Sequence, residues 1–567
     1  MLKFMNRLNL NDKKKSQFLN VISIIFLFFV ILIESLHSNV AELDSLHHGL
    51  IFPAAVAVKD GLFPHLDAFA QYGPLNPLIQ GLWLKVIGTR VFDLQLFTLV
   101  IATLISLLIF IICRRYFGNI TSSLIALAWL STGPHGLPWA SLTTNFLILA
   151  ALLLLISVTW SSFSKNICKL LDASSGFILA IAIFGRIQTV LVAGSVFLVL
   201  RTISPRRLVY YLIGSLAGFL GFVIYLQING ALIPFINECV IWASQTLGYA
   251  EVKPLSKSLV FEVSWFFWTA LFFALVIAWL NFLEKRFYKV QILRYASITS
   301  LFMVFILCGI FSNLSLGELY ENRGRVSLLD LEYFTLIASR KLLFSIDFAP
   351  LLVFLFIIGY LLLVRRMTFS ALHAETKLAL AVGVPSISQI FPISDSYHMW
   401  WLSAILVSCI AICRREFETL IWQKQINIFL VALLVGLQVQ SIIDFNKPRY
   451  SFSNYTLSGM KSSLSTSQEL DNTLTLLEKY VTPQSTRFIC KDGIYSVSSG
   501  NYNSVDSNFV NWSSKSGTSN ENYDYIFICY ASQVIIDSYA LKGWLPVVKV
   551  PFSTDPVSFN VLLRKAK

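Results

Sequence analysis

Two carboxylates and two histidines lie close together near the start of the chain, directly after its first long apolar run. The stretch reads Glu42-Leu-Asp44-Ser-Leu-His47-His48. Acidic side chains beside a membrane surface are costly, and they usually serve chemistry or bind a cation or polar head group. A carboxylate here could act as general base on an attacking hydroxyl or amine, or hold a divalent cation. Equally, Asp44 could cap a surface helix that begins at the next residue.

Two further polar segments could contribute to the same chemistry. In the loop after the first run, Asp67, Gln71 and Tyr72 precede a Gly-Pro pair, although such residues are also typical of turns. Much later, Asp395-Ser-Tyr-His398 precedes two tryptophans, and its acid and histidine would share one face of a helix. An aspartate and a histidine at this spacing only weakly indicate a metal site, because no third ligand lies nearby in the sequence. The tryptophans are expected to form an interfacial belt.

Arg186 stands between two apolar runs, and its guanidinium could clamp a phosphate with a fork of donors. The alternative is an arginine that extends from a helix end toward the membrane surface. The stretch between Lys169 and the basic cluster at Arg201 is short. We therefore expect a pair of short helices that turn near Arg186, too short for two complete crossings of about 20 residues each.

The amino-acid composition indicates which kind of secondary structure positions these residues. The chain has 567 residues, of which 56% are hydrophobic and only 13% charged, whereas a soluble protein has roughly a quarter charged. Apolar runs of about 18 or more residues recur along it. The fold class predicted is an α-helical polytopic membrane protein with about thirteen crossings. The first run, residues 18–33, is expected to be an uncleaved crossing that leads out from a cytoplasmic N-terminus.

The net charge of +13 reflects membrane topology, because the basic residues fall in short clusters between apolar runs. No basic stripe interleaved with aromatics supports nucleic-acid binding. The clusters place the first external loop, residues 36–90, on the outer side together with the Arg186 turn and the Asp395–His398 segment. Within that loop, residues 49–58 and 74–86 are expected to form helices on the membrane surface.

The C-terminal segment has a soluble composition, so the chain divides into a transmembrane domain, 1–445, and a small extracytoplasmic α/β domain, 446–567. A helix is expected at 468–480 and strands near 487–490, 523–529, 547–550 and 559–563. Cys490 and Cys529 could form a disulfide outside the cell, but their spacing does not decide this.

The order of these motifs resembles the C superfamily of membrane glycosyltransferases, which includes protein O-mannosyltransferases and the aminoarabinose transferases that modify lipid A. The likeness covers residues 15–445. The matching segments are Asp44, His48-Gly49, Gly61-Leu-Phe-Pro64-His-Leu-Asp67, Tyr72-Gly73-Pro74, Gly185-Arg186 and Phe391-Pro392 with Asp395 and His398.

The resemblance implies a transferase in the bacterial plasma (inner) membrane, with its active site on the extracytoplasmic side. It would move a hexosyl or pentosyl group, normally with inversion, from a polyprenyl-phosphate carrier to a lipid, glycan or protein acceptor. Asp44 would be the catalytic base, and Arg186 and His398 are candidates to hold the lipid phosphate. The other expected substrate-binding residues are His47, His48, Asp67, Gln71, Tyr72 and Asp395.

A second acid is the point at which this sequence departs from the family. Many members carry Asp-Glu here, whereas Ser45 follows Asp44. Glu42 is the nearest acid that could replace the missing one, so the sequence does not decide whether the reaction needs a metal cofactor. If a divalent cation binds, its candidate ligands are Asp44, Glu42 and His48.

Two other functions compete with the enzyme. A transporter or flippase of a lipid-linked or polar envelope precursor would place ionisable residues at mid-membrane and show repeated halves. A scaffold that presents the C-terminal domain to envelope partners would not need the dense acidic loop. No internal repeat is visible and the polar groups cluster outside, so the sequence favours the glycosyltransferase.

Overall fold

The computed structural model describes most of the helical part of the chain and parts of its C-terminal segment. The described residues are 25, 43, 45–68, 70, 72–131, 137–160, 163–242, 350–351, 353–355, 357–361, 368–390, 396–416, 450–462, 467–480, 486–489, 524–551 and 558–566. The expected first crossing lies almost entirely outside them, as do Cys490 and the link between the two predicted domains.

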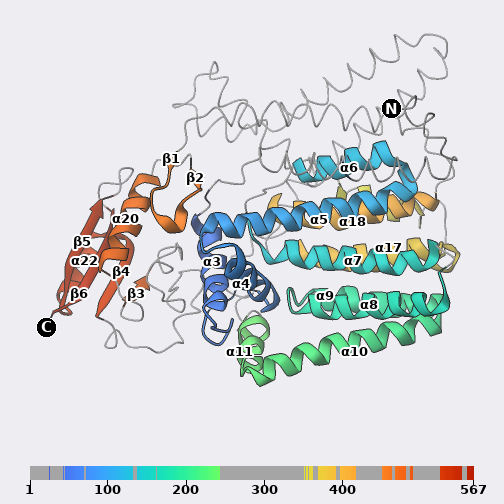
Figure 1. The fold of residues 1–567 in the computed structure, drawn as a ribbon, viewed down its shortest axis with the longest axis horizontal. Helices are drawn as coiled ribbons and strands as arrows, with labels where there is room; N and C mark the ends of the chain where they lie inside the picture. Colours follow the sequence, from blue (N-terminus) through green and yellow to red (C-terminus); the bar gives the residue numbers. More distant parts are fainter. Residues whose placement is uncertain are drawn as a thin grey trace, which may run out of the picture.

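The first described helices are mostly those that the sequence predicted. Two of them, α3 (Ser45–Lys59) and α4 (Leu75–Ile87), correspond to the expected surface helices and lie at the end of the helical body that is nearer to the C-terminal sheet (Figure 1). They lead into α5 (Val91–Phe117), α6 (Asn119–Ser131) and α7 (Ala140–Trp160). The body of the molecule consists of long helices that lie side by side along its longest axis (Figure 1).

The remaining helices complete this body. They are α8 (Lys165–Ile183), α9 (Thr189–Ile203), α10 (Pro205–Ile228), α11 (Leu232–Ile236), the π-helix η1 (Asn237–Trp242), helical residues 350–351, 353–355 and 357–361, η3 (Phe369–Ala371), α17 (Ala374–Ser386), η4 (Ile387–Ile390), α18 (Ser396–Cys413) and η5 (Arg414–Glu416). Within the described residues, α5, α7, α8 and α10 are long and apolar enough to cross a membrane. The protein is therefore an integral membrane protein whose described part is mostly helical.

The helix pair that turns near Arg186 is present. Helix α8 has 19 residues and is long enough to span a membrane, whereas α9 has only 15, so the pair does not make two complete crossings. Helix α8 is longer than the short helix expected, because it continues through its polar first turns. Asp172 in these turns is buried, and Arg207 of α10 donates to its carboxylate from Nε and Nη2 at 2.8–3.1 Å. A second expected crossing, α6, has 13 residues and falls short of the usual length.

Helices α8 and α10 pack closely because small residues line their contact. A Cβ at Gly214 would collide with the backbone carbonyl of Ala173, and one at Gly176 would collide with the carbonyl of Tyr211. Interfaces of this kind are common between membrane helices, where close backbone approach replaces the hydrophobic driving force of water. The contact fixes the direction of α8 and with it the position of the Arg186 turn.

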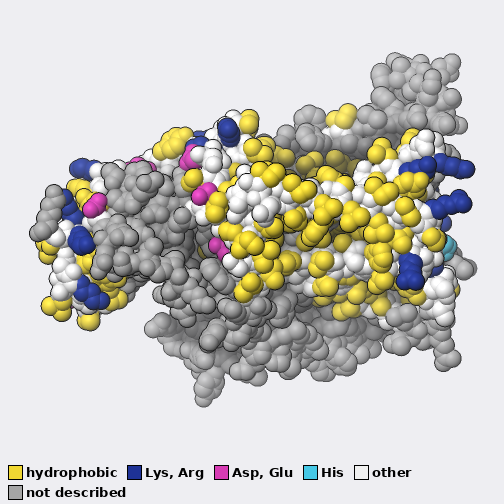
Figure 2. Space-filling view, turned by 90° about the horizontal axis from the view of Figure 1, so that it is seen from below, with side chains coloured by type: hydrophobic (Ala, Val, Ile, Leu, Met, Phe, Trp, Pro, Cys, Tyr) yellow, Lys and Arg dark blue, Asp and Glu magenta, His cyan; other side chains and the backbone are white. Residues whose placement is uncertain are grey.

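Basic side chains gather at the end of the body opposite α3 and α4 (Figure 2). There, two buried carboxylates join four helices. Glu375 accepts hydrogen bonds from Tyr116, Thr159 and Arg415, at 2.6–3.1 Å. Glu416 accepts from the backbone N–H of His373 and lies 3.1 Å from its Nδ1. This basic end agrees with the expected cytoplasmic side.

The C-terminal segment contains the predicted helix as α20 (Ser467–Tyr480). Each predicted strand overlaps one strand of a sheet with the order β3-β4-β6-β5. Its strands are β3 (Thr486–Ile489), β4 (Tyr525–Ser532), β5 (Trp544–Pro551) and β6 (Ser558–Lys565), and α22 (Gln533–Ala540) connects β4 to β5. Only the β3–β4 pair is parallel among these strands.

A short segment before α20 joins this unit to the helical body. It contains β1 (Tyr450–Ser451), η6 (Tyr455–Leu457) and β2 (Lys461–Ser462), and the carbonyl of Lys461 accepts from the N–H of Leu43 at 2.9 Å. Asp471 of α20 holds the segment in place. Burial alone would raise the pKa of this carboxyl, but hydrogen bonds from Ser453, Asn454 and Tyr450 hold the pKa below its usual value.

The packing of α8 on α10 gives a testable prediction. Gly214→Ala should lower the free energy of unfolding by about 1–3 kcal/mol, because the helices must separate to admit the methyl group. Gly221→Ala on the same helix is the matched control, since a Cβ there meets no atom within 4 Å. It should be neutral or slightly stabilising. Thermal unfolding in detergent measures both, and equal effects would contradict the proposed contact.

Candidate functional site

The turn between α8 and α9 packs directly against the Tyr72-Gly73-Pro74 segment. The backbone N–H of Leu75 donates to the carbonyl oxygen of Phe184 at 3.1 Å. A Cβ at Gly73 would collide with this same carbonyl, so the close approach requires glycine. Two segments that the sequence singled out separately, more than a hundred residues apart, are therefore in contact.

Arg186 is enclosed at this contact. Its side chain is buried, with the residue only 2% exposed, and Nη1 donates to Ser141 Oγ at 2.5 Å. The guanidinium carbon lies 5.1 Å from the centre of the Tyr72 ring, which is a cation–π arrangement. Its Nε has no hydrogen-bond partner, and no carboxylate pairs with Arg186 in the part of the chain that the structure describes. Arg186 is thus a buried cation without a described counter-charge.

Two unsatisfied hydroxyl groups lie close to this turn. A Cβ at Gly185 would stand 2.6 Å from Thr144 Oγ1, and the N–H of Thr189 donates to the carbonyl of Arg186 at 3.0 Å. Both threonine hydroxyls are buried, and among the described residues neither finds a partner. Unsatisfied buried polar atoms are rare, and several beside one cation are typical of a binding site for a polar group.

An aromatic chain connects this site to His398. Trp139 Nε1 donates to the Tyr72 hydroxyl at 3.1 Å, and the Trp139 ring stacks on Trp401 with centroids 5.7 Å apart. The rings of Trp401 and His398 form an edge-to-face contact, with their centroids 5.1 Å apart. The structure therefore brings Tyr72, Arg186 and His398 to one end of the body. Sequence reasoning did not single out Trp139 or Ser141.

The expected interfacial belt at Trp400 and Trp401 is wrong. Both residues are buried, at 0% and 2% exposure. Trp400 stacks on Trp129 with centroids 4.6 Å apart, and each indole donates to the other residue's carbonyl oxygen. These tryptophans hold α18 against α6 and α7, since Trp401 also accepts from Asn145.

The first-loop residues are placed only in part. Within α3, His48 is fully buried and its Nε2 lies 2.8 Å from Gln95 Nε2 of α5. Asp67 is partly buried, and its Oδ2 accepts from the N–H of Phe63 at 2.8 Å, which closes a turn. Outside the described residues lie Glu42, Asp44, Gln71 and Asp395, and the side chain of His47.

His65 makes a connection that sequence reasoning missed. Its φ of 67° is left-handed, which is uncommon outside glycine, and its Nδ1 lies 2.5 Å from Glu238 Oε2. Glu238 belongs to the π-helix η1, a kind of element often found at functional sites. The two residues are 173 positions apart, so no local pattern could have indicated the pair.

A metal centre is not defined by the described residues, which contain no group of three or more histidine, cysteine, aspartate or glutamate side chains with suitable geometry. Two of the three expected ligands, Asp44 and Glu42, lie outside them. The third, His48, is enclosed against Gln95 and does not fit the role of a ligand.

Comparison with known proteins finds matches among solved structures. No protein-family model matches the chain, and no curated protein does either. The chain is similar to the Archaeoglobus fulgidus oligosaccharyltransferase in complex with Zn and sulfate, at 11% identity and a TM-score of 0.43, over 94% of this chain and 72% of that one. It is also similar to ArnT from Cupriavidus metallidurans bound to undecaprenyl phosphate, at 11% identity and a TM-score of 0.44, over 95% and 97%.

A third similar structure is the archaeal oligosaccharyltransferase AglB from Archaeoglobus fulgidus, in complex with an inhibitory peptide and a dolichol-phosphate. Its identity is 11% and its TM-score 0.42, over 94% of this chain and 74% of that one. The names of these proteins agree with the resemblance in the sequence motifs. Because each TM-score is below 0.5, the function is argued from this chain's own residues.

The contact of Tyr72 with Arg186 and Trp139 gives a second prediction. Tyr72→Phe keeps the ring over Arg186 and loses one hydrogen bond, so the free energy of unfolding should fall by about 1 kcal/mol. Tyr72→Leu also removes the cation–π contact and should cost about 2 kcal/mol more. Denaturant unfolding in detergent, followed by tryptophan fluorescence, measures both.

Tyr225→Phe is the matched control, because Tyr225 on α10 is 43% exposed. It should leave the unfolding curve unchanged. Equal losses for Tyr72→Phe and Tyr72→Leu would show that the ring does not stabilise the buried cation.

Proposed function

We propose that the protein transfers a sugar from a polyprenyl-phosphate carrier to an acceptor, at the end of the helical body that carries α3 and α4. The observation that carries this proposal is the buried guanidinium of Arg186, which lacks a counter-charge among the described residues. A phosphate offers charge and acceptor oxygens that match a guanidinium. The lipid-linked donor would place its phosphate at Arg186.

The contrast with other charged groups in the same bundle supports this role. Asp172 pairs with Arg207, Glu375 with Arg415 and Glu416 with His373. An isolated buried charge is expensive, and proteins normally pair it or neutralise it. An arginine cannot lose its proton in a protein. Arg186 is therefore best explained as one half of an ion pair whose other half is a ligand.

The surroundings of Arg186 favour a ligand attached to lipid over a soluble anion. Ile187 lies in the same turn, Val190 and Leu191 lie in the first turn of α9, and these three residues are 37–53% exposed. Such an apolar surface suits contact with hydrocarbon. A polyprenyl chain could lie against this surface while its phosphate reaches the guanidinium.

The reaction then follows from the groups proposed for it. Asp44, as general base, takes the proton from an acceptor hydroxyl or amine, and the acceptor atom attacks the anomeric carbon of the sugar. The bond from that carbon to the phosphate oxygen breaks, and its electron pair stays on the phosphate. Arg186 stabilises this charge as it develops. Attack opposite to the leaving phosphate inverts the anomeric configuration.

The other sequence candidates would bind the sugar or its phosphate. His398 is coupled to the Arg186 site by the tryptophan pair, so it is the best supported of them. Asp67, Gln71, Asp395 and His47 are proposed to bind sugar hydroxyls or the acceptor. His48 is proposed to hold α3 on α5.

The proposed orientation puts the site on the extracytoplasmic face of a bacterial inner membrane. The basic end of the body lies opposite to α3 and α4, as the positive-inside rule requires for that orientation (Figure 2). The C-terminal sheet and α20 lie on the same side as the site (Figure 1). From this place they could bind the lipid, glycan or protein acceptor.

The role of Asp44 gives a third prediction. Purified protein, reconstituted with a panel of polyprenyl-phosphate sugars and a panel of lipid, glycan and protein acceptors, should release polyprenyl phosphate. Asp44→Asn should lower turnover by about 10²–10⁴-fold, because a general base typically contributes that factor. Asp60→Asn is the matched control, since Asp60 is an exposed acid of the same loop paired with Lys59.

Two outcomes would contradict the proposal in different ways. Equal turnover by wild type and Asp44→Asn would remove Asp44 as the base while leaving the transferase intact. No release from any donor, together with movement of a lipid-linked sugar across the vesicle membrane, would support the flippase.

A further inference from the structure

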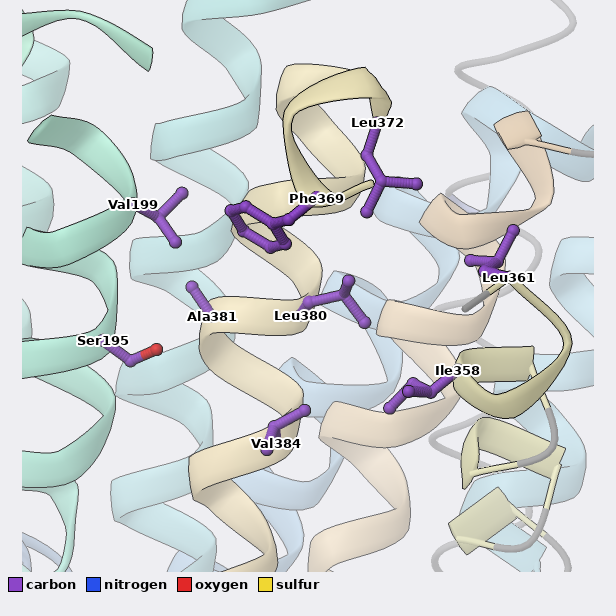
Figure 3. Close-up of a pocket in the computed structure, with 9 residues that line it drawn as sticks. All are labelled: Ser195, Val199, Ile358, Leu361, Phe369, Leu372, Leu380, Ala381 and Val384. Carbon is purple, nitrogen blue, oxygen red and sulfur yellow. The ribbon is translucent and has the colours of Figure 1, made fainter. Parts of the chain in front are cut away.

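A cavity of about 250 Å³ lies at the basic end of the body, far along the bundle from Arg186. It lies between α9, α17, η3 and the helical residues 357–361 (Figure 3). Its lining is almost entirely apolar, and Ser195 is the single lining residue with a polar side chain. Binding of water in such a cavity is unfavourable, because the apolar lining offers few hydrogen-bond partners.

The cavity is open toward the outside of the bundle. Two lining residues, Phe369 and Val384, are 39% and 47% exposed, although both belong to the apolar wall. At the level of membrane-spanning helices, the medium outside is the bilayer. A hydrocarbon chain could therefore enter sideways from the surrounding lipid.

A lysine stands at the rim of this cavity. Lys377 lies one turn before Leu380 and Ala381 on α17, so all three share the face that lines the cavity. Its Nζ lies 5.9 Å from the centre of the Phe369 ring and donates to the carbonyl oxygen of Ser370. Among the described residues, no carboxylate pairs with Lys377. The nearest acid in sequence, Glu375, is engaged by Arg415.

The same end of α9 adds positive charge. Arg201 is exposed and has no ion pair within the described part of the chain, but it follows the lining residue Val199 by two positions and so stands on another face of α9. It contributes to the positive field at this end, whereas Lys377 stands on the face that lines the cavity. An apolar groove between membrane helices with a basic residue at its rim can bind an anionic lipid head group.

We propose that this cavity is a binding site for an anionic phospholipid. One acyl chain fills the space between α9 and α17, and the head-group phosphate lies against Lys377. The site is distinct from the proposed catalytic site, because it lies at the opposite end of the bundle. The inference also stands without the proposed sugar transfer.

The test uses full-length protein in phosphatidylcholine vesicles. A small fraction of phosphatidylglycerol carries a photoactivatable group on its acyl chain, and labelled peptides are mapped by mass spectrometry. The same acyl probe on phosphatidylcholine gives the neutral comparison. Wild type should be labelled on α9 and α17, about fivefold more by the anionic probe, since one lysine contributes roughly that factor near an anionic lipid.

Four variants, two of them matched controls, test the basic residue and the cavity separately. Lys377→Gln should remove the preference for the anionic probe, whereas Lys165→Gln, at the same end on α8, should keep it. Ser195→Trp fills the cavity and should abolish labelling of α17. Leu198→Trp places the same ring on the same helix, at a residue that is 60% exposed and does not line the cavity, and should leave labelling intact.

The proposal is overturned by equal labelling with the two probes in wild type, or by equal labelling of Ser195→Trp and Leu198→Trp. Cross-links between two copies of the chain across α9 and α17 would also overturn it, because a second copy would then occupy the groove. Gel filtration checks the fold of each variant. If Ser195→Trp misfolds, the comparison of the two probes in wild type and in Lys377→Gln still tests the proposed lipid site.

Discussion

Arg186 is a permanent cation enclosed in protein at one end of an apolar bundle, and the cost of keeping its charge out of water constrains everything around it. Ser141 satisfies one nitrogen, and the face of Tyr72 supplies a weak negative field. Neither replaces a counter-ion. The arrangement depends on Gly73, because any side chain there would push the Tyr72 segment away from the α8–α9 turn.

The two ends of the bundle differ in how their buried charged groups are paired. At the basic end, Glu375 and Glu416 accept hydrogen bonds from several helices and pair with cationic groups, although the buried Thr376 hydroxyl has no partner among the described residues. At the other end, Arg186, Thr144 and Thr189 keep unsatisfied polar atoms within the described structure. The bilayer core supplies no water to satisfy such groups. This difference supports the proposal that the functional end is the one that carries Arg186.

Sequence patterns predicted local elements well, because period and composition act over short distances. The helices α3, α4 and α20 and all four strands of the C-terminal sheet lie close to the expected residues. The expected interfacial belt was wrong because the burial of Trp400 depends on a residue far away in the sequence. It stacks on Trp129, which is 271 positions away. The sequence also identified Tyr72, Arg186 and His398, but their connection through Trp139 and Trp401 is a property of the packed bundle.

The most direct test of the central claim is the affinity of wild type and Arg186→Gln for polyprenyl phosphate without a sugar, measured by thermal stabilisation in detergent. If Arg186 awaits a phosphate, the substitution should weaken binding about 10–100-fold, the value of a charged hydrogen-bonded contact. Without ligand, Arg186→Gln should unfold at a temperature no lower than wild type, because it removes an uncompensated charge. A variant that unfolds earlier yet binds polyprenyl phosphate as tightly as wild type would contradict the account.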